Sequence, residues 1–199
     1  MLIDLTHPIT HNMPKMPEDF GVKITIAKSV KRDGYHDTHI QLNMHTGTHI
    51  DMPTHMLEGK KRVNDYTLDD FIMPAKIVTY PMFEGHKIDH INQGDAVIIP
   101  TGHDALFYEK SYYQDYPVIK ESWIDALIRK GVKMIVLDTP SPDHSPYAIH
   151  HKCFNHEIFI VENARNLMSI PQNKSLTIFA IPLLLETEAS PIRCFVKIS

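Results

Sequence analysis

The chain has 199 residues, of which 43% are hydrophobic and 9% aromatic, so it can bury a sizeable core in a single domain spanning residues 1–199. Its 20 Lys and Arg against 24 Asp and Glu give a formal charge of −4, and the one tight basic cluster, at 60–62, is too small for a nucleic-acid-binding surface. Cys153 and Cys194 form no CxxC pair, which argues against a zinc ribbon or a disulfide scaffold.

Short β-rich runs bounded by Pro, Gly, Asn and Asp recur along the chain and predict strands. In chain order these runs are 2–5, 22–27, 39–44, 76–80, 96–100, 133–137, 158–162, 176–185 and 193–198. Helix signals are fewer, and they lie at 67–72, 121–130 and 163–168. We therefore expect an α/β protein with a strand-rich core.

The N-terminal residues lack the basic start and the long apolar stretch of a signal peptide. The most apolar run, at 178–185, contains Pro182 and is too short to span a bilayer. These features predict a cytoplasmic protein without a membrane partner. Prolines at positions 14 and 17 predict an extended arm or loop over residues 11–20.

The segment 39–55 combines a strand pattern with many metal-ligand side chains. Its odd positions are mostly polar and its even positions mostly apolar up to residue 51, as in a half-buried strand. A straight strand would separate the Cα atoms of His45 and His49 by about 13 Å, near the limit for two imidazoles that share one ion. Gly47 permits a bend between them and Pro53 ends regular pairing, so we predict a polar strand that coils into a loop.

His45, His49 and Asp51 offer two imidazoles and a carboxylate within this segment. Such a set suits Zn²⁺ or Mn²⁺ and leaves coordination positions open, which is typical of a catalytic site rather than a structural one. A lone imidazole on a strand is more often a hydrogen-bonded surface group. Four ligand-type residues in eleven, with Gly and Pro between them, favour a metal site.

A second group of potential ligands comprises His144, His150, His151 and His156, followed by Glu162 at the end of an apolar strand. An acid there is costly unless it is paired or bound to a cation. Glu162 could equally be a solvated strand end, and His150 and His151 cannot both point the same way on an extended chain. The residues alone leave this second cluster open.

Other catalytic patterns are weaker. The sequence has no GxSxG nucleophile elbow, no phosphate-binding Gly-rich loop and no dinucleotide fingerprint, and it contains only 8 glycines. Ser141, Asp143 and His144 have the residue types of a catalytic triad without its supporting context.

Residues 45–55 read HTGTHIDMPTH and match the pattern HxGTHxDxPxH at all seven fixed positions. In this the chain resembles the cyclase-like metal-dependent hydrolases, a family that includes bacterial kynurenine formamidase and isatin hydrolase. Weaker matches extend along nearly the whole chain, at 5–9, 94–102, 137–143 and 162–167.

The resemblance implies a swivelling β/β/α-type fold, a homodimer or higher homo-oligomer, and one or two metal ions, with Asp51 able to bridge a pair. The downstream ligands of the family, a His and a Glu twelve residues later, correspond to His150 and Glu162, which selects His150 over His151. The resemblance also implies that His55 lies beside the metal and acts in proton transfer.

Together these features predict a metal-dependent hydrolase that acts on a small-molecule substrate. It would cleave an amide-type bond, in an arylformamide such as N-formylkynurenine or in a cyclic amide, by metal-activated water. The cofactor would be Zn²⁺, at one or two ions per chain, or Mn²⁺. His55 would relay the proton that the departing group needs. The alternatives are a metal-dependent cyclase or dehydratase and a non-catalytic metal-binding scaffold.

Overall fold

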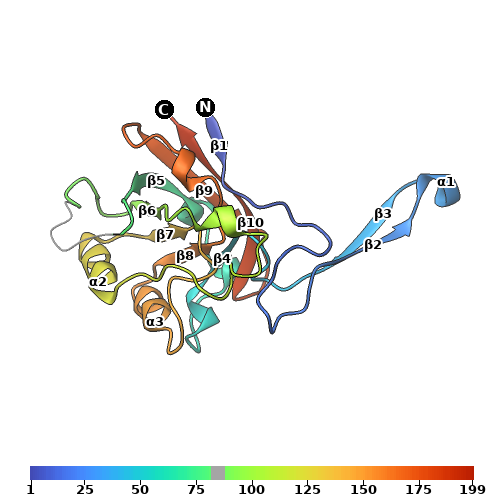
Figure 1. The fold of residues 1–199 in the computed structure, drawn as a ribbon, viewed down its shortest axis with the longest axis horizontal. Coiled ribbons are helices and arrows are strands. Elements are labelled where there is room, and N and C mark those ends of the chain that lie inside the picture. Colours follow the sequence, from blue (N-terminus) through green and yellow to red (C-terminus); the bar gives the residue numbers. More distant parts are fainter. Residues whose placement is uncertain (82–87) are drawn as a thin grey trace.

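A β-barrel forms the body of the molecule in the computed structural model, which describes residues 1–81 and 88–199 (Figure 1). The ring closes because β10 pairs with β4 on one side and with β9 on the other. In spatial order the seven barrel strands are β10 (Ala189–Ile198), β4 (His49–Asp51), β8 (Phe159–Glu162), β7 (Met134–Leu137), β6 (Ala96–Ile99), β5 (Ile72–Ile77) and β9 (Leu176–Pro182). An eighth strand, β1 (Leu2–Asp4), pairs with β10 outside the ring.

The strands from β5 to β8 run parallel to one another, and β6, β7 and β8 are buried on both faces. Alternate side chains of each strand therefore enter two different cores. Ile98, Val136 and Val161 belong to the core inside the barrel. Their neighbours Ile99 and Ile135 belong to a second core outside it. Continuous apolar runs in the sequence thus become strands with no solvated face.

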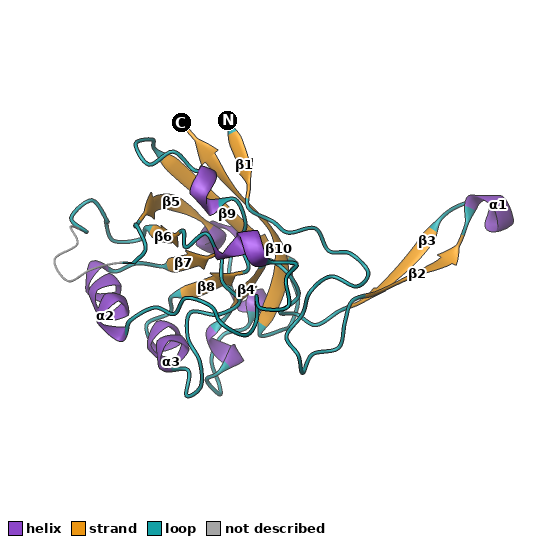
Figure 2. Ribbon diagram, in the orientation of Figure 1, coloured by secondary structure: helices purple, strands orange, loops and turns teal. Residues whose placement is uncertain are grey.

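Two helices cover the outer core, α2 (Glu121–Lys130) and α3 (Ala148–Asn155), which lie beside each other along the parallel strands (Figure 2). Trp123 and Phe154 supply their largest buried side chains. The remaining helix, α1 (Val30–Asp33), is distant from the barrel. Short 3₁₀ turns occupy Pro53–His55, Val63–Asp65, Leu68–Phe71, His103–Leu106 and Leu167–Ser169. Among the described residues no helix combines the length and apolarity needed to cross a membrane.

The predicted α/β class with a strand-rich core is confirmed, and so are most of the strands and the helix that ends at Gly131. The helix predicted at 163–168 is wrong. Asn163 and Asn166 adopt positive φ angles of 52° and 61°, which interrupt any helix there and leave only a short 3₁₀ turn. The segment 67–72 likewise forms one 3₁₀ turn, and α3 was not predicted at all.

A two-stranded arm projects from the barrel (Figure 1). It consists of β2 (Lys23–Lys28) and β3 (Asp37–Gln41), paired antiparallel, with α1 at its tip. The predicted strand at 39–44 therefore begins earlier and ends at Gln41. The extended arm or loop predicted at 11–20 is a loop, part of which lies against the body of the protein.

The two-faced burial of the parallel strands predicts a steep stability cost for truncation. Ile98 on β6 is 0% exposed, so Ile98→Ala should lower the free energy of unfolding by about 2–5 kcal/mol. Leu68→Ala, at a side chain that is 58% exposed, is the control and should change it by less than about 0.5 kcal/mol. Urea denaturation measures both, and equal effects would contradict the assignment of the core.

Candidate metal centre

The pairing of β4 with β8 brings the first two site residues together. Its antiparallel register sets His49 directly opposite Glu162. Side chains alternate along a strand, so Glu162 points to the same side of the sheet as Ile160, toward the outer core. His49 and Asp51 share one face of β4, while Ile50 between them enters the barrel. The strand pair therefore delivers an imidazole and two carboxylates to one place.

The turn before β4 carries His45 and depends on Gly47. Gly47 has a φ of 61°, in the left-handed region that favours glycine. Thr48 fixes the turn, because its hydroxyl donates to the Asn163 carbonyl at 2.6 Å. The bend predicted at Gly47 is confirmed.

Helix α3 supplies His150 to the same site. The Nδ1 of His150 donates to Asp143 Oδ1 at 2.6 Å, and its other nitrogen, Nε2, lies 3.3 Å from Glu162 Oε1. The Nδ1 of His49 similarly donates to the Gly47 carbonyl at 2.9 Å. A hydrogen bond of this kind fixes the orientation of an imidazole and leaves its other nitrogen free to ligate.

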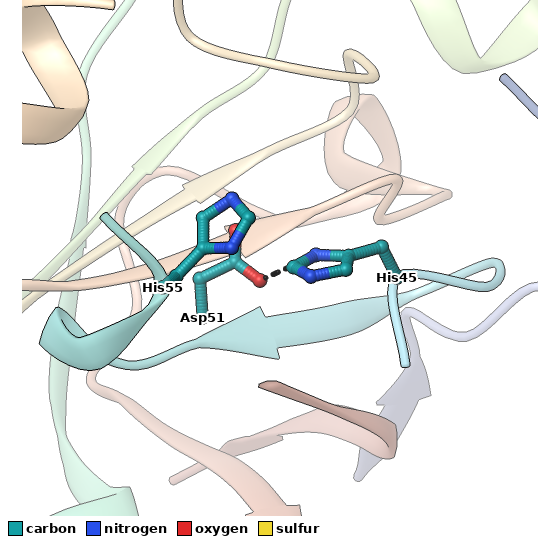
Figure 3. A group of neighbouring side chains, drawn as sticks. All are labelled: His45, Asp51 and His55. Atoms are coloured by element: carbon teal, nitrogen blue, oxygen red, sulfur yellow. Dashed lines mark ion pairs between the residues drawn. The ribbon is translucent and has the colours of Figure 1, made fainter. Parts of the chain in front are cut away.

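The five residues predicted as metal ligands converge in the structure. Asp51 Oδ1 lies 3.0 Å from His45 Nδ1 and 3.5 Å from His49 Nε2. Glu162 Oε2 lies 3.3 Å from His49 Nε2. Figure 3 shows Asp51 between the imidazoles of His45 and His55. The imidazoles and the two carboxylates thus form one connected group of side chains, which come from four segments of the chain.

Four buried ligand atoms in this group make no hydrogen bond, namely His49 Nε2, both Asp51 carboxylate oxygens and Glu162 Oε1. The imidazole nitrogens lie near these oxygens but are not directed for hydrogen bonding. Unpartnered polar atoms at this depth are costly, and a cation would satisfy them together. The donor set of imidazole nitrogens and carboxylate oxygens fits Zn²⁺ or Mn²⁺.

The buried carboxylates raise the pKa of two histidines of the site, so they favour positive charge at the positions where a cation could bind. Burial alone would lower the pKa of His45, but the Asp51 carboxylate outweighs it and raises that pKa to about 10. Burial would likewise lower the pKa of His150, which Asp143 and Glu162 instead raise to about 10. The carboxylates thus attract positive charge strongly.

His55 has the opposite tendency. Burial lowers the pKa of His55 below its ordinary value, and the neighbouring charge of His45 lowers it further against the attraction of Asp51. The imidazole rings of His45 and His55 are 4.3 Å apart between centroids. The lowered pKa favours the neutral form of His55, which has a ring nitrogen free to accept a proton or to ligate a metal.

The side chains form two three-residue groups that share Asp51. One contains His49 and Glu162, the other His45 and His55, and the ligand atoms within each group lie within 4.8 Å of one another. This arrangement could hold two ions bridged by Asp51. It also gives His55 a second role to test, as a ligand, beside proton transfer.

A cleft of about 480 Å³ opens onto the site and is lined by His45, His55, His150 and Glu162. Its further walls carry three tyrosines, Tyr113, Tyr116 and Tyr147. The volume falls in the range of small-molecule sites. Sequence reasoning did not predict the tyrosines, because Tyr113 and Tyr116 lie in a long loop without a motif.

The remaining histidines of the second cluster have other positions. His151 is exposed, and His156 donates from Nδ1 to the Lys152 carbonyl at 2.9 Å. His144 lines the cleft and packs on Tyr116, with 4.4 Å between ring centroids. Asp143 bonds to His150 rather than to His144, so the residue types of a triad at 141–144 form none.

Comparisons with known proteins agree with the motif and the fold. The model of the Cyclase family ("Putative cyclase") matches residues 3–144, more than half of the chain. A kynurenine formamidase of Bacillus cytotoxicus is 26% identical over 98% of this chain and 96% of its own. A "predicted metal-dependent hydrolase" of Bacillus stearothermophilus is 26% identical, with a TM-score of 0.77 over 98% and 97% of the two chains.

Isatin hydrolase A of Ralstonia solanacearum shares the fold, with a TM-score of 0.83 at 19% identity over 98% of this chain and 91% of its own. At this low sequence identity the similarity shows only that the two chains share a fold. The family model matches the sequence of this chain itself, and the matched range includes the segment 45–55 of the candidate metal centre. The chain therefore belongs to the Cyclase family.

Proposed function

We propose that the chain is a metal-dependent hydrolase that cleaves an amide-type C–N bond in a small molecule, an arylformamide or a cyclic amide. The observation that carries this proposal is the set of four buried ligand atoms without hydrogen-bond partners at the base of an aromatic-lined cleft. The similarity to a kynurenine formamidase and to a "predicted metal-dependent hydrolase" supports it.

The ligands we propose are His45, His49, Asp51, His150 and Glu162. They would hold one or two divalent ions, Zn²⁺ or Mn²⁺, because imidazole and carboxylate groups suit both metals. When bound, such an ion lowers the pKa of a coordinated water and polarises a carbonyl group. Asp51 belongs to both three-residue groups, so it is the residue that would join two ions.

The residues of the chain supply orientation and proton transfer. Asp143 holds His150 with Nε2 toward Glu162. His55 faces the cleft, where its imidazole can accept a proton from the attacking water and donate it to the departing nitrogen. Tyr116 and Tyr147 offer flat apolar faces on which the aromatic part of a substrate could lie.

The first test of this function is metal-dependent turnover. Purified protein should contain at least one Zn²⁺ or Mn²⁺ per chain, and chelation should abolish hydrolysis of N-formyl aromatic amines, cyclic imides or lactams until metal is restored. In ¹⁸O-labelled water the acid product should carry the label, since hydrolysis adds water to the carbonyl. Elemental analysis that finds no metal, before or after reconstitution, would contradict the proposal. Turnover without the label would instead favour a cyclase or dehydratase.

The second test concerns Asp143, which uses both carboxylate oxygens. Oδ1 accepts from His150, and Oδ2 accepts from the Ile149 backbone amide at 2.6 Å. Asp143→Asn keeps only one acceptor, so metal affinity should fall by about 10- to 100-fold. His151→Ala is the control, because it removes the exposed imidazole next to His150. We expect isothermal titration to show wild-type affinity for the control, and a wild-type result for Asp143→Asn would exclude its positioning role.

The third test separates the two roles of His55. If His55 transfers protons, His55→Ala should retain metal and lose about 10²-fold or more in kcat, the usual scale of general acid–base catalysis. Metal content and kcat are to be measured on the same preparation. Loss of metal in proportion to activity would make His55 a ligand of the ion held with His45 and Asp51.

A further inference from the structure

The cleft above the metal centre is lined by two acids that the proposed ligand set does not use, Glu18 and Asp19. Among the described residues that line the cleft there is no Lys or Arg, and the other ionisable groups are histidines, tyrosines and Glu162. The wall that the N-terminal loop contributes therefore brings negative charge to the space that a substrate fills.

The loop that presents these acids closes around its own lysine. Lys15 Nζ donates to the carbonyls of Met16 at 3.1 Å and Pro17 at 3.2 Å, and also to the carbonyl of Asp19. The ammonium group is thus directed at backbone oxygens, and Lys15 lines a neighbouring groove instead of the cleft. The cation of the loop therefore fixes its shape, while the two carboxylates remain on the side of the cleft.

Asp19 is connected to the metal centre through one side chain. Its Oδ1 accepts from Asn43 Nδ2 at 2.9 Å, and Asn43 Oδ1 accepts from the backbone amide of His45, also at 2.9 Å. Asp19 is thereby held one residue away from a proposed ligand. Within the part of the chain that the structure describes, Asp19 Oδ2 makes no hydrogen bond. One oxygen of a positioned carboxylate is therefore available to a substrate.

The tyrosines of the cleft add a second feature that favours a cation. Burial raises the pKa of Tyr113, and the charges of Glu162 and Asp19 raise it further, so Tyr113 is within electrostatic reach of both the metal centre and the loop. The face of a tyrosine ring attracts cations, and Tyr116 and Tyr147 line the same cleft. Aromatic faces next to a carboxylate suit an ammonium group, which can contact both.

We propose that the substrate of this site carries a positively charged amine at the end that faces Glu18 and Asp19, away from the bond that is cleaved. This inference rests on the proposed function, because it takes the scissile carbonyl to lie at the metal centre. The ammonium group donates to Asp19 Oδ2, lies near Glu18 and contacts the ring of Tyr113. Both acids repel an anionic substituent at the same place.

The first experiment measures binding without turnover. Benzohydroxamates chelate a divalent ion, and a para and a meta series carry an aminomethyl, an ethyl or a carboxymethyl group on the ring. With Zn²⁺-loaded protein, isothermal titration should give the aminomethyl compound a Kd about tenfold lower than that of its ethyl isostere, and the carboxymethyl compound the highest Kd. Equal Kd values in both series would overturn the inference. No binding of any compound would overturn the metal centre and the inference with it.

The second experiment removes the charges of the loop. Glu18→Gln with Asp19→Asn should bring the Kd of the aminomethyl compound to within about twofold of that of the ethyl compound. Glu109→Gln is the matched control, because Glu109 is exposed and lines the neighbouring groove with Lys15, and it should keep the wild-type preference. Glu18→Lys should instead favour the carboxymethyl compound, a gain that a misfolded variant does not show. A preference that survives the double substitution would overturn the assignment of these acids.

The third experiment separates this inference from the proposed function by hydrolysis of formanilides with the same three substituents. The aminomethyl compound should exceed the ethyl compound about tenfold in kcat/KM, mainly through a lower KM, because the amine contact does not change as the C–N bond breaks. Hydrolysis of all three with equal kcat/KM would support the hydrolase and overturn amine recognition. Hydrolysis of none, with the binding preference intact, would overturn the hydrolase and support amine recognition.

Discussion

The burial of two carboxylates in one place is the constraint on which the rest of the site depends. The side chains of Asp51 and Glu162 are 1% and 7% exposed. An uncompensated charge at such depth costs several kcal/mol, so positive charge must face these oxygens. Imidazoles do so at distances of 3.0 to 3.5 Å without forming good hydrogen bonds. A divalent cation meets the same need more fully, because it can contact oxygens and nitrogens from several directions at once.

This constraint accounts for residues that touch no ligand position themselves. A histidine that ligates a metal through one nitrogen almost always donates the proton of the other to a carboxylate, a carbonyl or water. The Gly47 carbonyl and the Asp143 carboxylate hold Nδ1 of His49 and His150 and direct both Nε2 atoms toward Glu162. The conformation of Gly47 thus has two consequences, since it turns the chain between His45 and His49 and aims its own carbonyl at the second of them.

The sequence predicts those elements that are determined by residues adjacent to one another in the chain. Apolar runs predict the parallel strands, and Gly131 in a left-handed conformation ends α2 where the pattern indicates. Helix α3 has no such local signal. Tyr147, at its N-cap, makes no side-chain cap bond, and the cap comes from Asp143, whose carboxylate accepts from Ile149. A helix capped from six residues away is not visible in a pattern of neighbouring residues.

The same distinction applies to the site. His45, His49 and Asp51 lie within seven residues, so their density was apparent in the sequence, as was the bend at Gly47. The role of Asp143 and the tyrosine walls of the cleft depend on contacts between distant segments, which no spacing encodes. For Asp143 the usable signal was a carboxylate just before a cluster of histidines.

The arm is a case in which a clear sequence pattern does not predict the surroundings of the residues that form it. Alternation along β2 and β3 predicts one apolar face, and a sequence gives no means of knowing what covers it. Within the described residues the chain covers only its base, at Ile24, and leaves Ile26 and Ile40 exposed. The alternation therefore predicts which face of the arm is apolar, and the structure shows that the outer part of this face is exposed.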